Sequence, residues 1–376
     1  MRSAFLVAAV VAVSSLGCSS SKGTAGGGGS GAGGGGTGGQ GGSAVSYPEP
    51  FTITAFDDTR ITSQQDQPNF QTVDAPIDWG EGPFAEVRLI VDLDTTCYPF
   101  EKWQSNPPPA GENFPADCDA FDRNYEWSLK PATDDGAPTL ELIRAITPFG
   151  GPLHIEEDIT DIANYFTGAR RLSSHITTWS DGAGMVSGSN GGWNVSARIE
   201  VTPGPAPREV LKIESLHYGS MQSGDLPASR SLEIPEGTSY ARVDYRVTGH
   251  GGGPQGINCI GPADEFCRRT HVITVDGQEA ASFIPWRDDC ADLCTVASYG
   301  TPPNGFDYCM ENPTGNMQSV RAPRANWCPG SVTPAIVLDP AALRMPGMHS
   351  FDWNIENVAD GGSWKVSATL FAYANL

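Results

Sequence analysis

Short runs of alternating apolar and polar residues recur along this chain, and they restrict it to an all-β fold. Alternation with a period of two puts successive side chains on opposite faces of a strand. Clusters of Pro, Gly and Asp separate the runs, and we expect a helical turn only at residues 161–167. Many short strands joined by turns are typical of β-sandwiches and jelly rolls. The clearest runs are residues 87–93, 195–201, 241–247, 351–355 and 364–372.

A proline-rich segment at residues 202–207 marks the expected joint between two strand-rich halves. The chain has 376 residues, a length that suits about two domains of ordinary size. We therefore predict an N-terminal β-sandwich domain at residues 49–203 and a C-terminal one at residues 208–376.

The first residues have the pattern of a bacterial export signal, predicted at residues 1–18. Arg2 precedes an apolar run, Ala4 to Val13, that is too short to span a bilayer, and small residues then lead to Cys18. The end of this segment resembles a lipobox, whose Cys is lipidated after cleavage. A plain signal peptide with an incidental Cys is the alternative. Residues 19–48 are rich in Gly and are expected to form a flexible tether spanning about 30 Å.

The charge balance excludes one large class of functions. The chain has 23 Lys and Arg against 44 Asp and Glu, which gives a formal charge of −21. Nucleic acids and anionic membrane surfaces are bound mainly through basic side chains. We therefore expect no nucleic-acid partner, and membrane contact only through the N-terminal lipid.

The cysteines indicate an oxidising compartment. Of the nine, Cys18 is assigned to the lipid, and the remaining eight are an even number in an exported chain, which indicates four disulfides. Composition alone leaves 105 pairings of eight cysteines open. No Cys-x-x-Cys motif occurs and the six histidines are scattered singly, so we expect neither a metal nor a cofactor.

Without reference to any family, the candidate chemistry lies in acidic residues near cysteines. Asp119 and Asp122 follow Cys118, and Asp264 and Glu265 lie between Cys259 and Cys267. Most carboxylates of so acidic a protein are simply solvated, but a crosslinked loop holds a carboxylate in place, as general acid–base chemistry requires. The glycine-rich segment 249–253 lacks the Lys of a phosphate-binding loop and is expected to end a strand.

Several motifs occur in the same order as in one known family. The second half contains Cys259…Asp264-Glu265-Phe266-Cys267 and, later, Arg324-Ala325-Asn326-Trp327-Cys328-Pro329-Gly330. The first half contains Cys118-Asp119-Ala120-Phe121-Asp122-Arg123 and, later, Thr177-Thr178-Trp179. These motifs resemble the peptide-N-glycosidase F family over about residues 51–374.

The resemblance implies an all-β fold of two side-by-side antiparallel jelly-roll β-sandwich domains with a cleft at their junction. It also implies disulfide pairings, with the last pair left over as an addition of this sequence. The implied pairs are Cys97–Cys118, Cys259–Cys267, Cys290–Cys328 and Cys294–Cys309.

The family hydrolyses the amide bond between Asn and the first N-acetylglucosamine of N-linked glycans. By resemblance, Asp122 is the main catalytic residue and Glu265 a supporting carboxylate. The substrate-binding positions that match the family are Arg123, Arg324, Trp179, Trp327, Phe121 and Thr177. The expected partners are N-linked glycopeptides or glycoproteins, bound by an exported monomer that is either anchored in the bacterial cell envelope, at the outer membrane, or secreted.

The chain departs from the family pattern at a few of these positions. Thr177 stands where the family has a third carboxylate, and a hydroxyl cannot replace a carboxylate in proton transfer. Phe121 replaces a Trp, and Pro323 replaces an Asp before the matched Arg. These departures define the main rival hypothesis, a glycan-binding surface lipoprotein that keeps the fold without the chemistry. A copper monooxygenase is a third alternative, which the absence of a His-x-His pair disfavours.

Overall fold

The computed structural model describes residues 46–375 apart from 134–138, 182–185, 226, 253–257, 302 and 304. The predicted signal peptide, Cys18 and the tether up to residue 45 lie outside the described residues. The described residues from Tyr47 onward belong to one compact unit. Within the described part of the chain, none of the helices is both long and apolar enough to cross a membrane.

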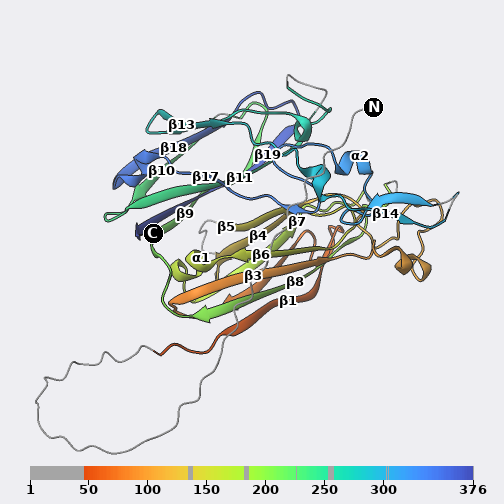
Figure 1. Ribbon diagram of the computed structural model, residues 1–376, viewed down its shortest axis with the longest axis horizontal. Helices are drawn as coiled ribbons and strands as arrows, with labels where there is room; N and C mark the ends of the chain where they lie inside the picture. Colours follow the sequence, from red (N-terminus) through yellow and green to blue (C-terminus); the bar gives the residue numbers. More distant parts are fainter. Residues whose placement is uncertain are drawn as a thin grey trace, which may run out of the picture. The chain divides into compact units, whose positions relative to one another are not determined.

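The first half of this unit consists of strands with one short helix and one 3-10 turn. The elements are β1 (Phe51–Thr62), β2 (Thr72–Asp78), β3 (Phe84–Asp94), η1 (Phe100–Gln104), β4 (Asn124–Pro131), β5 (Leu140–Ile146), β6 (Leu153–Asp158), α1 (Thr160–Tyr165), β7 (Ala169–Ile176) and β8 (Gly192–Pro203). One sheet has the strand order β1-β8-β3-β6, and β5-β4-β7-β2 run side by side in another (Figure 1). The helix α1 lies at the predicted helical turn.

The second half has the same composition of short strands and turns. Its elements are β9 (Glu209–Gln222), β10 (Ala228–Ile234), β11 (Tyr240–Gly251), η2 (Asp264–Phe266), β12 (His271–Val275), β13 (Gln278–Phe283), η3 (Cys290–Leu293), β14 (Val296–Tyr299), β15 (Phe306–Cys309), α2 (Met317–Val320), β16 (Ser331–Val332), β17 (Ile336–Leu338), η4 (Ala341–Arg344), β18 (Gly347–Ile355) and β19 (Gly362–Asn375). The sheets are β17-β11-β19-β9 and β10-β18-β12-β13.

The all-β prediction is confirmed, and each alternating run of the sequence falls inside one strand: β3, β8, β11, β18 or β19. The pairings between these strands and their neighbours are antiparallel. In the first half, strands 1-8-3-6 form one sheet and strands 2-7-4-5 lie in the other. The second half repeats this alternation of early and late strands, an order compatible with the predicted jelly rolls.

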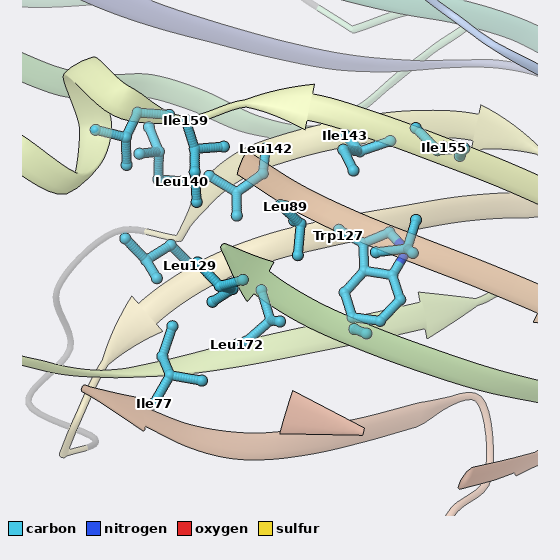
Figure 2. Packing of buried hydrophobic residues seen from close by; sticks show 14 of the residues in the cluster. Ile77, Leu89, Trp127, Leu129, Leu140, Leu142, Ile143, Ile155, Ile159 and Leu172 are labelled. Carbon is cyan, nitrogen blue, oxygen red and sulfur yellow. The ribbon is translucent and has the colours of Figure 1, made fainter. Parts of the chain in front are cut away.

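An apolar core fills the space between the two sheets of the first half (Figure 2). Leu89 of β3 comes from one sheet, Trp127 of β4 and Leu172 of β7 come from the other, and all three are fully buried. Their alternation with polar neighbours places one face of each sheet in this core. A second cluster, built around Val243, Trp353 and Leu370, fills the other half.

The two halves contact each other through polar side chains. Arg144 of β5 is fully buried and donates to both carboxylate oxygens of Glu141, at 2.8 and 3.0 Å. The same Glu141 accepts a hydrogen bond from the hydroxyl of Ser367 on β19. On the neighbouring strand β4, Glu126 lies opposite Arg144 and accepts a hydrogen bond from the hydroxyl of Tyr218 on β9. The outward face of the β5-β4-β7 sheet is therefore polar because it packs on the second half.

Two segments of the second half also reach across to the first. β16 pairs with β5, with Ser331 opposite Ile146. The β14–β15 hairpin packs its aromatic side chains against Phe100, whose ring centroid lies 4.9 Å from that of Tyr299 and 5.1 Å from that of Tyr308. The halves are thus joined along their length rather than only by the segment between β8 and β9.

Candidate functional site

Four disulfides hold the loops at the junction of the two halves. They are Cys97–Cys118, Cys259–Cys267, Cys290–Cys328 and Cys294–Cys309, the same pairs that the resemblance implied. The first ends four residues before Asp122, and the second encloses Glu265. A protein with this many disulfides is typical of exported chains.

The loop that carries Asp122 is fixed by its neighbour Asp119. Asp119 is fully buried, and its carboxylate accepts hydrogen bonds from Nη2 of Arg123 at 3.0 Å and from Nε at 3.1 Å. The backbone N–H of Phe121 also donates to Asp119, at 3.2 Å. Because Asp119 takes up the charge of Arg123, Asp122 is left as the partly exposed carboxylate of this loop.

The loop that carries Glu265 is built in the same way. The adjacent Asp264 is fully buried and accepts hydrogen bonds from Nη2 of Arg269 at 2.6 Å and from Nε1 of Trp364 at 3.0 Å. The carbonyl oxygen of Glu265 accepts one from the backbone N–H of Ala325 at 2.8 Å. The Glu265 side chain keeps 25 % of its surface exposed. Each half therefore contributes one carboxylate on a loop anchored by a buried aspartate.

Arg324 connects the two carboxylates. Its Nη1 lies 3.3 Å from Oε1 of Glu265, and its side chain is 1 % exposed. Its guanidinium carbon lies 4.9 Å from the ring centroid of Phe266 and 4.4 Å from that of Trp327, within cation–π range of both. A guanidinium held in this way is a fixed positive charge beside the two acids.

The electrostatics of the pair favour one proton shared between them. Burial raises the pKa of Asp122 and that of Glu265, and the charge of Arg324 lowers both. The charge of Asp122 further raises the pKa of Glu265, so the two groups interact directly. Two interacting carboxyl groups titrate as a pair, in which one holds a proton while the other is ionised. The arrangement can therefore supply a general acid and a general base in one place.

Exposed aromatic side chains lie beside Asp122. Trp179 is 41 % exposed, and its ring centroid lies 6.5 Å from that of Phe121. The guanidinium carbon of Arg123 lies 5.1 Å from the Phe121 ring and 5.3 Å from the Trp179 ring. Arg123 thus stiffens an aromatic surface, and the exposed face of Trp179 is suited to stacking on a sugar ring.

Trp327, which the resemblance implied as a substrate-binding residue, is buried beneath the site, and its ring is not exposed for stacking on a sugar. It is 1 % exposed, its Nε1 donates to the carbonyl oxygen of Gly249 at 2.9 Å, and its ring stacks on His250 with centroids 5.1 Å apart. Trp327 follows Arg324 by three residues in the motif, and its ring packs against the Arg324 guanidinium.

Thr177 is exposed directly after β7. Its backbone N–H donates to the carbonyl oxygen of Asn124 at 3.0 Å, which continues the ladder between β4 and β7. Its hydroxyl lies 3.4 Å from Nε2 of His175. The position therefore lies on the strand next to β4, one ladder step from the loop that carries Asp122, without a carboxylate of its own.

Sequence reasoning missed three residues of this region. Phe266 contacts Arg324, although the motif in which it stands gives it no role. Asn124 follows Asp122 by two residues, and His250 lies in a glycine-rich segment that resembles a plain loop. Among the described residues, one group has the spacing of metal ligands, Asp289 with Cys290 and Cys328, but both of its sulfurs are used in a disulfide.

Comparisons with known proteins agree with the fold. Residues 217–371 match the family described as "Peptide-N-glycosidase F, C terminal". No curated protein sequence matches the chain. A structure of peptide-N(4)-(N-acetyl-beta-D-glucosaminyl) asparagine amidase has a TM-score of 0.64 at 16 % identity, covering 87 % of this chain and 97 % of that one.

Two further structures have the same fold. PNGase F, a glycosylasparaginase from Flavobacterium meningosepticum, has a TM-score of 0.63 at 17 % identity, covering 88 % of this chain and 97 % of that one. PNGF-II has a TM-score of 0.63 at 18 % identity over 86 % of this chain, which spans only 66 % of the PNGF-II chain. The resemblance seen in the motifs is confirmed at the level of the fold, and residues 217–371 match the C-terminal domain of the peptide-N-glycosidase F family.

Proposed function

We propose that this protein is a glycoamidase that hydrolyses the amide bond between Asn and the first N-acetylglucosamine of N-linked glycans on peptides or proteins. The single observation that carries the proposal is that the charges of Asp122 and Glu265, which come from different halves, influence each other, with the charge of Arg324 acting on both. A family relationship alone would not select these residues from the 44 acidic ones in the chain.

The reaction breaks the bond between the side-chain carbonyl carbon of Asn and the glycosyl nitrogen. The ionised carboxylate, assigned to Asp122, takes a proton from water, whose oxygen attacks that carbonyl carbon. The protonated carboxyl, assigned to Glu265, donates a proton to the departing nitrogen. Arg324 stabilises the negative charge that develops on the carbonyl oxygen. The products are an Asp side chain and a glycosylamine, so atoms and protons balance.

Four further substrate-binding residues complete the proposed site. Trp179 stacks on a pyranose ring, with Phe121 and Arg123 beneath it. Thr177 contributes a hydroxyl to the same wall. Trp327 remains in the proposal only as the support of Arg324.

The test uses the full chain, purified after export, on a denatured N-glycoprotein in water enriched in heavy oxygen. Mass spectrometry is expected to show glycan release and conversion of the linked Asn to Asp, with one heavy oxygen in the new carboxyl group. Asp122→Asn should abolish release, whereas Asp117→Asn, an exposed acid of the same loop, should retain it. Release by the Asp122 variant at the wild-type rate would refute the assignment.

The rival function, a glycan-binding lipoprotein without chemistry, is favoured by one observation, the absence of a carboxylate at the exposed position of Thr177. It predicts that wild type binds the glycopeptide and releases nothing, and that Trp179→Ala abolishes binding while Asp122→Asn does not.

We also propose that Cys18 carries a lipid and that the Gly-rich tether holds the folded unit near a bacterial membrane, with sandwich domains at residues 49–203 and 208–376. Labelling with a radioactive fatty acid in wild type but not in Cys18→Ser tests the anchor. Equal labelling of both chains would contradict it.

A further inference from the structure

Two buried polar atoms near the carboxylate pair have no hydrogen-bond partner among the described residues. They are Oδ1 of Asn124 and Nε2 of His250. An unpaired buried polar atom costs about 1 to 3 kcal/mol, so such atoms are uncommon unless a ligand or water completes them. They come from opposite halves of the protein, Asn124 from β4 and His250 from β11.

Asn124 faces the second half of the protein. It precedes Glu126 by two residues in the same strand, so the two side chains lie on the same face of the sheet. Glu126 accepts its hydrogen bond from Tyr218, a residue of the second half. Asn124 therefore lies between Asp122 and Glu126, on the face that is turned towards β11 and β19.

His250 is held rigidly beside the loop that carries Glu265, because Ala325 makes backbone hydrogen bonds with both Gly249 and Glu265. The N–H of Gly249 donates to the carbonyl oxygen of Ala325 at 3.2 Å, and the carbonyl oxygen of Gly249 accepts from Trp327. A side chain on Gly249 would come within 2.7 Å of the Trp364 ring, so only glycine allows this packing. The ring of His250 stacks on that of Trp327, with centroids 5.1 Å apart, and the guanidinium carbon of Arg324 lies 4.4 Å from the same Trp327 ring.

The imidazole is neutral at physiological pH. Burial lowers the pKa of His250 to about 3, and the charges of Arg144 and Arg324 act in the same direction. A neutral imidazole protonated at Nε2 offers one N–H donor there, whereas Oδ1 of Asn124 is an acceptor. Together, one donor and one acceptor complement a secondary amide, which has one C=O and one N–H.

We propose that Asn124 and His250 bind a secondary amide of the substrate, with Oδ1 accepting from its N–H and Nε2 donating to its carbonyl oxygen. The inference rests on the proposed function, because the substrate class contains two such groups. One is the 2-acetamido group of the first sugar, and the other is the amide bond that is cleaved. Both residues then determine specificity, and neither takes part in proton transfer.

The experiment measures binding in the Asp122→Asn chain, so that no hydrolysis is needed. Isothermal titration compares two glycopeptides, one with N-acetylglucosamine on Asn and one with glucose, which has a hydroxyl in place of the acetamido group. Asn124→Leu and His250→Phe, added to Asp122→Asn, are each expected to raise the dissociation constant of the first peptide about tenfold, the equivalent of one hydrogen bond. His250→Gln, whose amide nitrogen can approach the Nε2 position, should recover part of the loss. His154→Phe, an exposed histidine, is the matched control and should bind normally.

The two peptides identify the amide. If the 2-acetamido group is the partner, both substitutions leave the binding of the glucose peptide unchanged, and if the scissile amide is the partner, they weaken it equally. The inference would be overturned if both substitutions left the dissociation constant of the first peptide within twofold of the Asp122→Asn value, with thermal unfolding unchanged. The two atoms would then be hydrated and would not bind substrate. Failure of the wild type to release glycan overturns the proposed function instead, and Asn124-dependent binding would survive it. Absence of all binding would overturn the inference as well.

Discussion

Nη1 of Arg144 donates a hydrogen bond to the backbone carbonyl oxygen of Lys365 at 2.6 Å. Arg144 belongs to β5 of the first half and Lys365 to β19 of the second, so this bond fixes the position of one sheet against the other. Asp122 and Glu265 come from these two halves. Their mutual distance therefore depends on a polar contact that neither residue makes.

The contact predicts a large and specific loss of stability. Arg144→Met leaves the buried carboxylate of Glu141 without its partner, and breaking one side of a buried ion pair costs about 3 to 5 kcal/mol. Unfolding in urea should show this loss. The double variant Arg144→Met with Glu141→Leu should recover most of it, because no buried charge remains at this pair. Arg344→Met, which breaks an exposed pair with Asp339, should cost under about 1 kcal/mol. Equal effects of the two Arg substitutions would contradict the buried-pair argument.

Arg324 predicts a shift in the pH dependence of glycan release. Its positive charge lowers the pKa values of both Asp122 and Glu265, so Arg324→Met raises both. Because Asp122 acts in the ionised form, activity is lost as the pH falls through the pKa of the pair. The acid limb of the kcat/KM profile should therefore move to higher pH in the variant, with a fall of about 100-fold at the optimum from loss of charge stabilisation.

The control for this shift is Arg321→Met, a substitution of an exposed arginine that follows α2. It should leave both the profile and the rate as in wild type. An Arg324→Met profile whose acid limb stays in place would mean that this guanidinium does not act on the titrating pair.

Thr177 predicts a gain of function. The exposed Thr177 lies on the strand next to β4, where a longer acidic side chain has room to reach the solvent-filled site. Thr177→Glu should raise kcat/KM for glycan release about tenfold or more, because a positioned carboxylate contributes to proton transfer. Thr177→Gln has the same shape without the charge and should not. If both variants behave alike, the third carboxylate is not what limits this protein.

Most of the fold follows from local patterns in the sequence. Period-two alternation locates the long strands because each has one face in an apolar core, as Leu89 in β3 and Leu370 in β19 illustrate. The alternation does not locate β5. All seven of its residues are buried because its second face packs on the other half, so Leu140–Ile146 shows no regular alternation of buried and exposed side chains.

The candidate site was only partly predictable. The positions of the cysteines narrowed the candidate acids to Asp119, Asp122, Asp264 and Glu265, and the resemblance to the family selected Asp122 and Glu265 among them. The sequence does not show whether an aromatic side chain on a loop points into the protein or towards the substrate. The motif therefore predicts Trp327 as a substrate-binding residue, whereas its buried indole packs against Arg324. The sequence does not identify His250, because its position in the site is set by contacts with Trp327 and Ala325, which are distant in sequence.

The disulfides predict a separation of stability from activity. Cys259–Cys267 closes a segment of 8 residues around Glu265, whereas Cys294–Cys309 spans 15 residues and closes the β14–β15 hairpin. Loop entropy gives about 2.5 kcal/mol for the first and about 3 kcal/mol for the second, nearly equal contributions to the free energy of unfolding.

The effects of removing these two disulfides on glycan release should nevertheless differ strongly. Replacing both Cys259 and Cys267 by Ala frees the loop that holds Glu265, so kcat should fall at least tenfold at a temperature where the chain is folded. Replacing Cys294 and Cys309 by Ala should leave kcat within about twofold. Parallel urea unfolding and glycan-release assays on the two double variants test this, and a large loss of kcat in the hairpin variant would show that the hairpin itself belongs to the site.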